Sequence, residues 1–200
     1  MKKIVYLISP NKLDKYFYRN LEKILSFGNT AFFQLRLKKI SKQKIIRVSK
    51  KIKKITKKHK VKFILNDDYE LALKVKADGC HMGQSDGSFE IARIKLKSKI
   101  LGITCHNSKI YANEALTHNP NYIAFGSFHK SKLKPKAIKS NLGILKWASK
   151  NTKKSIIAIG GIDNKNYKKL IRSGAKYIAI SSFIWDNPNL KPELAIKMFK

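Results

Sequence analysis

The stretch SKQKIIRVSKKIKKITKKHKVKFILND, residues 41–67, contains the pattern that decides the fold. In its first part, apolar side chains recur every three or four residues, so they share one face of a helix, and lysines occupy the opposite face. These apolar residues are Ile45, Val48, Ile52 and Ile55. Residues 62–67 then contain a short continuous apolar run, FIL, typical of a strand that helices cover on both faces. The stretch predicts a helix followed by a buried strand.

The helix predicted over residues 41–60 has two interpretations. A basic amphipathic helix can lie on a membrane surface, but packing of its apolar face against a sheet is the more common case. We expect the second arrangement, with Ser41 as the residue that caps the helix N-terminus.

Similar apolar runs recur along the chain and alternate with segments of helical period. We predict strands over residues 3–9, 31–36, 62–67, 79–83, 99–104, 122–127, 155–161 and 177–182. We predict helices near residues 13–26, 41–60, 69–76, 88–98, 108–118, 138–150, 164–173 and 191–199. This alternation predicts an α/β chain with one domain over residues 1–200, a (β/α)8 TIM barrel, and an open doubly wound sheet is the alternative.

The chain is strongly basic, with 44 Lys and Arg against 12 Asp and Glu and a formal charge of +32. Such a charge invites a nucleic-acid or membrane partner. However, Lys, Ile and Asn are abundant while Arg is scarce, a bias that an AT-rich genome produces without selection, and the lysines are spread along the chain. We therefore expect small-molecule substrates, with a general attraction for phosphorylated ones, but no specific nucleic acid and no membrane.

The sequence predicts a cytoplasmic protein. No apolar run approaches the roughly 20 residues of a membrane-spanning helix, and the apolar stretch near the N-terminus is too short for a secretory signal. The two cysteines, Cys80 and Cys105, make no disulfide framework and are expected as small core residues. The sequence allows a homo-oligomer but does not determine the number of subunits.

Polar residues and glycines are concentrated at the ends of the predicted strands. In a barrel of this type, the reacting groups project from the C-terminal strand ends. The residues found there are Gln34, Arg36, Lys38, Asn66, Asp67, Asp68, His81, Gln84, Asp86, Thr104, His106, Ser127, Gly160, Gly161, Ser181 and Ser182. A single strand end is often polar only because it enters solvent, but the whole set predicts a site at this rim.

Two acidic residues after neighbouring strands, Asp67 and Asp86, predict a Mg²⁺ site. Mg²⁺ commonly takes one or two protein carboxylates and keeps water and substrate phosphate oxygens as its other ligands. The alternative is that Asp67 and Asp68 both cap the helix that starts near residue 69, since acidic residues favour a helix N-terminus. We assign capping to Asp68 and the metal to Asp67 and Asp86.

The motifs AIGGID (residues 158–163) and AISSF (residues 179–183) match the phosphate site of many TIM barrels, which uses the loops after the seventh and eighth strands. Backbone N–H groups of Gly160, Gly161, Ser181 and Ser182 are expected to bind phosphate oxygens. The Cys-His pairs at residues 80–81 and 105–106 do not predict zinc, because adjacent strand residues face opposite sides.

Five motifs follow one another along the chain: QLRLK (34–38), ILND (64–67) with ALKVKADGCHMGQSD (72–86), LGITCHN (101–107), YIAFGSFHKSKLK (122–134) and IAIGGI (157–162). In this order they resemble the thiamine phosphate synthase family, also called thiamin-phosphate pyrophosphorylase. The likeness covers nearly the whole chain. Its most specific part resembles the family's Ile-Asn-Asp and its Ala-Asp-Gly-x-His-x-Gly-Gln with a trailing Asp.

The resemblance implies a transferase that joins hydroxymethylpyrimidine diphosphate to hydroxyethylthiazole phosphate through a pyrimidine carbocation, giving thiamine phosphate and pyrophosphate. By matching position, it implies the following roles: Gln34, Arg36, Lys38 and Asn66 hold the diphosphate substrate, Asp67 and Asp86 hold Mg²⁺, Thr104 lies beside the pyrimidine and pyrophosphate, Ser131 and Lys134 belong to a mobile substrate loop, and Gly161, Ser181 and Ser182 bind the thiazole phosphate. Arg36, Lys38, Thr104 and Lys134 are the residues expected to act in catalysis.

The sequence also departs from the family pattern. Asp68 replaces a usual Arg, Leu133 replaces a Thr of the loop, and Leu37 stands where Glu is common. These departures leave the turnover efficiency open, and they affect the loop more than the metal site. Lys130 or Lys132 could compensate electrostatically.

Two other functions fit parts of the sequence. A thiazole tautomerase-like paralogue would share the fold and the phosphate site without needing a metal, but the retained Asn66, Asp67 and Asp86 favour the synthase. A basic RNA-binding barrel without catalysis would bind RNA with a steep salt dependence, yet no RNA-binding motif is visible.

Overall fold

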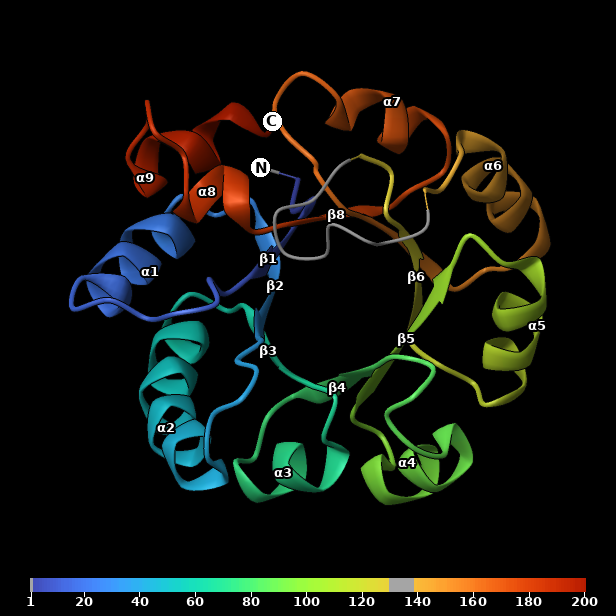
Figure 1. Ribbon diagram of the computed structural model, residues 1–200, viewed down its shortest axis with the longest axis horizontal. Helices are drawn as coiled ribbons and strands as arrows, with labels where there is room; N and C mark the ends of the chain where they lie inside the picture. The colour runs from blue at the N-terminus through green and yellow to red at the C-terminus, as the bar shows by residue number, and fades with distance from the viewer. Residues whose placement is uncertain (1, 130–138) are drawn as a thin grey trace.

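Eight parallel strands form a closed barrel in the computed structural model, which describes residues 2–129 and 139–200. The strands follow one another in chain order, and β8 pairs with β1 to close the ring (Figure 1). Their bounds are β1 (Val5–Ile8), β2 (Thr30–Leu35), β3 (Lys62–Asn66), β4 (Gly79–Met82), β5 (Ile100–His106), β6 (Tyr122–Gly126), β7 (Ser155–Ile159) and β8 (Tyr177–Ile180). The eight predicted strands and the TIM barrel are confirmed, and the open sheet is wrong.

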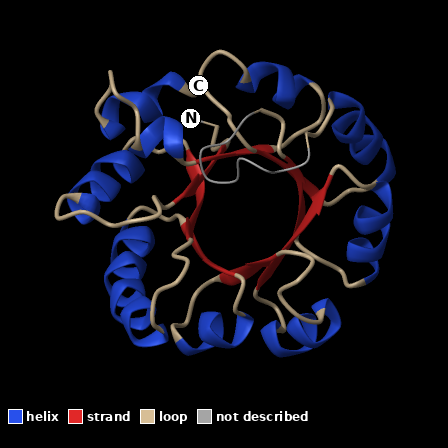
Figure 2. Cartoon of the chain, in the orientation of Figure 1, coloured by secondary structure: helices blue, strands red, loops and turns tan. Residues whose placement is uncertain are grey.

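Helices form an outer layer around the barrel (Figure 2). Their bounds are α1 (Phe17–Ser26), α2 (Lys42–Lys58), α3 (Tyr69–Lys74), α4 (Phe89–Leu96), α5 (Lys109–Thr117), α6 (Leu142–Asn151), α7 (Tyr167–Arg172), α8 (Ser182–Trp185), α9 (Pro192–Ala195) and the 3₁₀ helix η1 (Ile196–Met198). The predicted helices are present, the last of them as α9 and η1. Helix α8 was not predicted, because the strand expected to reach residue 182 ends at Ile180 instead.

The long helix α2 packs as its sequence pattern predicts. The Ser41 hydroxyl accepts a hydrogen bond from the Lys44 backbone N–H, which confirms the N-cap. Val48 and Ile52 are buried against the barrel. Burying a side chain of this size stabilises a fold by roughly 1.5–3 kcal/mol, so packing on the sheet holds the helix in place.

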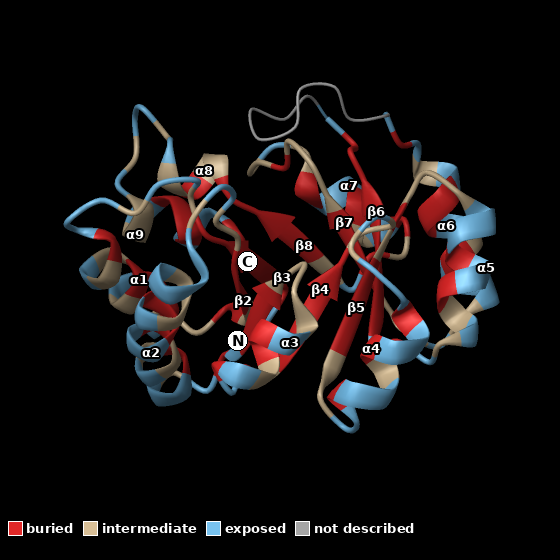
Figure 3. Ribbon diagram, turned by 60° about the horizontal axis from the view of Figure 1, so that its bottom comes forward, coloured by how far each residue is buried: buried red, intermediate tan, exposed pale blue. Residues whose placement is uncertain are grey.

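Side chains alternate along each strand between the helical layer and the barrel interior. In β1, Val5 and Leu7 belong to the large core under the helices, whereas Tyr6 and Ile8 belong to a smaller cluster inside the barrel. The other buried members of this inner cluster are Ile64, Tyr122, Ala124, Ile157 and Ala179. Most strand residues are buried, and the partly buried or exposed ones lie mainly near the strand ends (Figure 3). The inner cluster forms an apolar floor beneath the C-terminal strand ends.

Both cysteines, Cys80 and Cys105, are free and fully buried in the outer core, as expected. His81, next to Cys80, faces the barrel interior and lines the cavity described below, so this Cys-His pair is split between the two sides of the sheet. Within residues 2–129 and 139–200, no helix has the length and apolar character needed to cross a membrane.

Candidate active site

A cavity of about 930 Å³ opens at the C-terminal strand ends, a size suited to small-molecule ligands. Every described residue that the sequence analysis assigned to substrate or metal binding lines it. These residues are Gln34, Arg36, Lys38, Asn66, Asp67, Asp86, Thr104, Gly161, Ser181 and Ser182. Ser131 and Lys134 lie outside the described residues. Residues from six different strands or the loops that follow them therefore meet in one place, as the barrel topology requires.

Asp67 and Asp68 are adjacent in sequence but face different surroundings. Asp67 has a φ of 69°, a left-handed conformation that Asp tolerates better than most residues, and it lines the cavity. Asp68 is the N-cap of α3, where its carboxylate accepts the Leu71 N–H at 2.8 Å and pairs with the Lys42 ammonium at 2.9 Å. Capping by Asp68 is confirmed.

The second cavity acid, Asp86, is held in a turn after β4. Its Oδ2 atom accepts the Gly83 backbone N–H at 2.7 Å. Burial raises the pKa of Asp86, and the nearby Asp67 carboxylate raises it further, although the Gly83 N–H acts in the opposite direction. The two carboxylates therefore lie close enough to repel each other, an arrangement that a shared cation would relieve.

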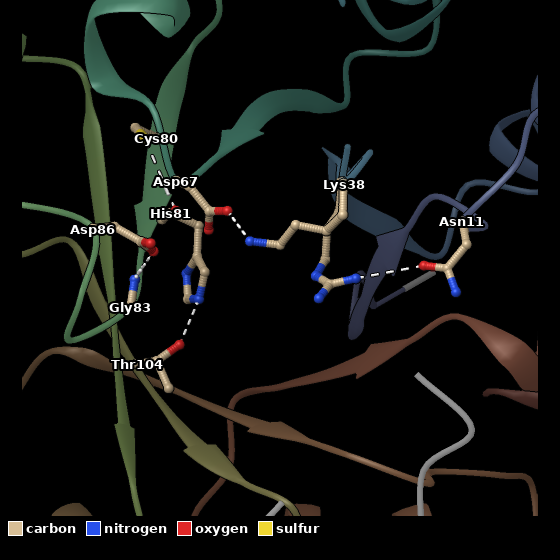
Figure 4. A network of polar contacts seen from close by, with 9 residues as sticks. Asn11, Lys38, Asp67, Cys80, His81, Gly83, Asp86 and Thr104 are labelled. Atoms are coloured by element: carbon tan, nitrogen blue, oxygen red, sulfur yellow. Dashed lines mark hydrogen bonds and ion pairs between the residues drawn. The ribbon is translucent and has the colours of Figure 1, made fainter. Parts of the chain in front are cut away.

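The loop after β2 supplies two cationic side chains to the cavity, and one of them, Lys38, points toward Asp67 (Figure 4). The Lys38 ammonium makes an ion pair with the Asp67 carboxylate. The Arg36 guanidinium lies 3.5 Å from Asn11 Oδ1. The backbone N–H of Arg36 donates to Ser9 Oγ at 3.0 Å. Both cations line the cavity, so a bound anion would meet positive charge beside the two carboxylates.

The opposite side of the cavity contains the predicted phosphate site. Gly160 has a φ of 103°, and a Cβ atom there would lie 2.0 Å from Ser127 Oγ, so only glycine fits. The Ser181 hydroxyl donates to the Ser9 carbonyl at 3.1 Å, which fixes the turn from β8 into α8. The start of α8 and the Gly160-Gly161 turn both border the cavity.

A buried hydrogen-bond network crosses the barrel beneath the cavity. Gln34 Nε2 donates to the Tyr6 hydroxyl at 3.1 Å, and the Tyr6 and Tyr122 hydroxyls are 2.7 Å apart. His81 Nδ1 lies 3.0 Å from the Tyr122 hydroxyl, and His81 Nε2 lies 2.7 Å from Thr104 Oγ1. The five residues Gln34, Tyr6, Tyr122, His81 and Thr104 are called the Gln34–Thr104 network below.

Sequence reasoning missed the two tyrosines of this network. The available signal was a hydroxyl-bearing residue within an otherwise apolar strand, because a buried tyrosine usually needs a hydrogen-bond partner. Gln84 was recognised only as polar, but its Nε2 donates to the Thr104 carbonyl at 2.6 Å and so supports the end of β5.

The departures in sequence have local explanations. Asp68 does not line the main cavity, because helix α3 and Lys42 hold its carboxylate outside it. Leu37 is partly buried against the outer core, where an apolar side chain is well suited. Leu133 lies outside the described residues.

The family model and the similar curated proteins that match this chain agree on one protein family. The family model for thiamine monophosphate synthase matches residues 5–184. A thiamine-phosphate synthase of Pelagibacter ubique is 50% identical over 200 residues, covering 100% of this chain and 97% of the relative. One of Erythrobacter litoralis is 38% identical over 186 residues, covering 90% of this chain and 87% of the relative.

Solved structures match the fold. A thiamine phosphate pyrophosphorylase from Pyrococcus furiosus superposes with a TM-score of 0.86 at 24% identity, covering 98% of this chain and 93% of the other. An orotidine 5'-phosphate decarboxylase from Pyrococcus horikoshii also superposes, with a TM-score of 0.68 at 12% identity, covering 96% and 95%. Since proteins with different reactions share this barrel, the fold alone does not choose the chemistry.

Proposed function

The chain belongs to the thiamine monophosphate synthase family, and we propose that its cavity joins hydroxymethylpyrimidine diphosphate to hydroxyethylthiazole phosphate, releasing pyrophosphate. It is a transferase, a thiamine-phosphate synthase. The observation that carries the choice of substrates is the convergence of Asp67 and Asp86 with Lys38 and Arg36 at one rim of the cavity, opposite the Gly160-Gly161 turn. This arrangement has room for a diphosphate on one side and a monophosphate on the other.

The two carboxylates fit a magnesium ion. Asp67 and Asp86 would hold it, because both supply carboxylate oxygens, the ligands that Mg²⁺ prefers. The two carboxylates are near neighbours, since the Asp67 carboxylate raises the pKa of Asp86. When bound, Mg²⁺ would neutralise charge on the departing diphosphate. The part of the chain that the structure describes offers no group of three or more His, Cys, Asp or Glu side chains, so the remaining ligands would be water and phosphate oxygens.

The other cavity residues position the reactants and stabilise charge. Arg36 can contact phosphate oxygens in a bidentate manner, while Lys38 supplies a point charge that can move from Asp67 to the diphosphate. Gln34, Asn66 and Thr104 orient the pyrimidine diphosphate, so that its carbocation forms within reach of the thiazole nitrogen. The backbone around Gly161, Ser181 and Ser182 binds the thiazole phosphate.

Two further parts of the proposal rest on sequence. Ser131 and Lys134 are assigned to the substrate loop by motif position alone. A cytoplasmic location is supported by the two buried free thiols, which suit a reducing compartment. The retained acid pair favours the synthase over a tautomerase-like paralogue.

The test is pyrophosphate release by the purified protein with Mg²⁺ and both substrates. Asp67→Ala and Asp86→Ala should each lower kcat/KM on the order of 10²–10³-fold, as expected for loss of a group that organises transition-state charge. Calorimetric titration with Mg²⁺ in the presence of pyrophosphate should show weaker metal binding in both variants.

Asp68→Ala is the matched control, because it removes the adjacent carboxylate, which faces Lys42. It should change kcat/KM only a few-fold. Equal losses of kcat/KM in all three variants would contradict the assignment of Asp67 and Asp86 as metal ligands and of Asp68 as a helix cap. Absence of pyrophosphate release by the wild-type protein, with an intact fold, would reject the proposed reaction.

A further inference from the structure

The Gln34–Thr104 network connects two residues on opposite sides of the cavity. Gln34 is on β2 and Thr104 is on β5, and both line the cavity. Tyr6, Tyr122 and His81 lie between them in the barrel interior, with 2%, 1% and 8% of their surfaces exposed. The mechanism proposed above uses only the two ends, so the three linking residues need an explanation of their own.

The packing holds the linking residues in fixed orientations. The His81 and Tyr122 rings are stacked, with centroids 5.6 Å apart and an interplanar angle of 9°. The Tyr6 and Tyr122 rings meet edge to face at 5.6 Å. Because these rings cannot easily rotate, each hydroxyl can satisfy its hydrogen bonds only with the partners already in place.

The hydrogens of the network have one consistent order. Gln34 Nε2 can only donate, so the Tyr6 hydroxyl accepts from it. Among the described residues, Tyr6 has Tyr122 as its other hydroxyl partner, so its own hydrogen must go there; otherwise a buried O–H would lack an acceptor. By the same argument, the Tyr122 hydrogen goes to His81 Nδ1.

The order then continues through the imidazole. If Nδ1 accepts, a neutral His81 carries its proton on Nε2, and this N–H donates to Thr104 Oγ1 at 2.7 Å. A doubly protonated His81 would instead leave the Tyr122 hydrogen without an acceptor. The Thr104 hydroxyl hydrogen is consequently available to a ligand in the cavity. Gln34 also lines the cavity, and because its Nε2 atom is turned to Tyr6, we infer that its carbonyl Oε1 atom is the group left for a ligand.

We propose that Tyr6, Tyr122 and His81 are positioning residues that fix Gln34 as a hydrogen-bond acceptor and Thr104 as a donor toward the diphosphate substrate. The matching ligand carries an N–H group on its heterocycle opposite Gln34 and an electron-rich oxygen or nitrogen opposite Thr104. This inference rests on the proposed function for its substrate, but the order of hydrogens is a property of the free protein.

The order can be tested without any substrate. NMR of protein with ¹⁵N-labelled histidine distinguishes a protonated from an unprotonated ring nitrogen, and comparison with His81→Asn assigns the signals. We expect proton on Nε2 and none on Nδ1 of His81 at neutral pH. A proton on Nδ1, alone or together with one on Nε2, would overturn the proposal. This result does not depend on catalytic activity, so it separates a failure of this inference from a failure of the proposed reaction.

The functional consequence can be tested with tyrosine variants. Tyr6→Phe and Tyr122→Phe should each raise KM for the pyrimidine diphosphate roughly tenfold, the equivalent of one hydrogen bond, while KM for the thiazole phosphate stays unchanged. Tyr177→Phe is the matched control, because Tyr177 packs against the same inner cluster outside the cavity lining and should leave both constants unchanged. Equal changes in both KM values, or the same effect in Tyr177→Phe, would point to a merely structural role and reject the proposal.

Discussion

At the level of single residues, Asp67 and Asp68 show how backbone conformation places two identical, adjacent side chains in different surroundings. Asp67 turns into the cavity through a left-handed φ, while Asp68 is in the extended region and caps α3. Burial alone would raise the pKa of Asp68, but the Lys42 ammonium and the Leu71 N–H together hold it below its ordinary value. The charged form of Asp68 therefore stabilises the folded chain.

We expect Asp68→Ala to lower the free energy of unfolding by about 1 kcal/mol at pH 7, a typical value for a lost cap. Because the folded-state pKa is lowered, the stabilisation is present above the unfolded pKa of about 3.9 and is lost as pH falls through the lower folded value. Urea unfolding at pH 7, 4 and 3 measures this. Ser88→Ala is the control, since the Ser88 hydroxyl caps α4 without titrating. A loss in Asp68→Ala that is independent of pH would contradict the assignment.

The candidate site residues could be predicted from the sequence, because polar side chains follow directly after the apolar runs that mark the strands. The sequence did not predict which of them pair. Lys38 was expected at the diphosphate, but in the free chain it pairs with Asp67. The Tyr6–Tyr122 contact joins residues 116 positions apart, and no local pattern encodes such a distance.

At the level of secondary structure, the close approach of β5 to the Tyr122 ring depends on a glycine. A Cβ atom at Gly102 would lie 1.9 Å from Tyr122 Cζ and 2.2 Å from Cε2. The ring could not remain where it stacks on His81 if any side chain occupied this position.

Gly102→Ala should therefore destabilise the fold by about 1–3 kcal/mol, the usual cost of overpacking a core, and displace Tyr122. Chemical denaturation measures the loss. In a Gly102→Ala/Tyr122→Leu double variant the clash is reduced, so its destabilisation should be smaller than the sum of the single effects. Additive effects would show that the two positions do not compete for the same space.

The strands were predictable because a parallel barrel buries both faces of its sheet, which leaves continuous apolar runs in the sequence. Helix α8 was not, since its four residues are too few for a helical period and its apolar Phe183 and Ile184 follow directly after the strand-like run. Boundaries of short elements depend on tertiary contacts such as the Ser181–Ser9 hydrogen bond.

At the level of the whole molecule, the excess of positive charge has two opposing effects. Self-repulsion among the lysines destabilises the compact state, and only four lysine–carboxylate ion pairs offset it within the described residues. The same field would attract the phosphorylated substrates proposed above toward the cavity.

Added salt should consequently raise the melting temperature while lowering kcat/KM for both substrates several-fold, because it screens repulsion and attraction alike. Thermal unfolding and steady-state kinetics between 50 mM and about 500 mM KCl measure the two effects. A parallel fall of melting temperature and activity would mean that salt acts on folding rather than on substrate capture.

The pairing of β1 with β8 also has a consequence for biosynthesis. Val5 lies beside Ile178, so β1 stays without one of its two neighbours until translation has passed β8, more than 170 residues later. During that interval its open edge is exposed to other nascent chains, a situation in which strands tend to associate wrongly. The ring can close only after β8 has been translated, and slow elongation would prolong the time during which β1 depends on chaperones.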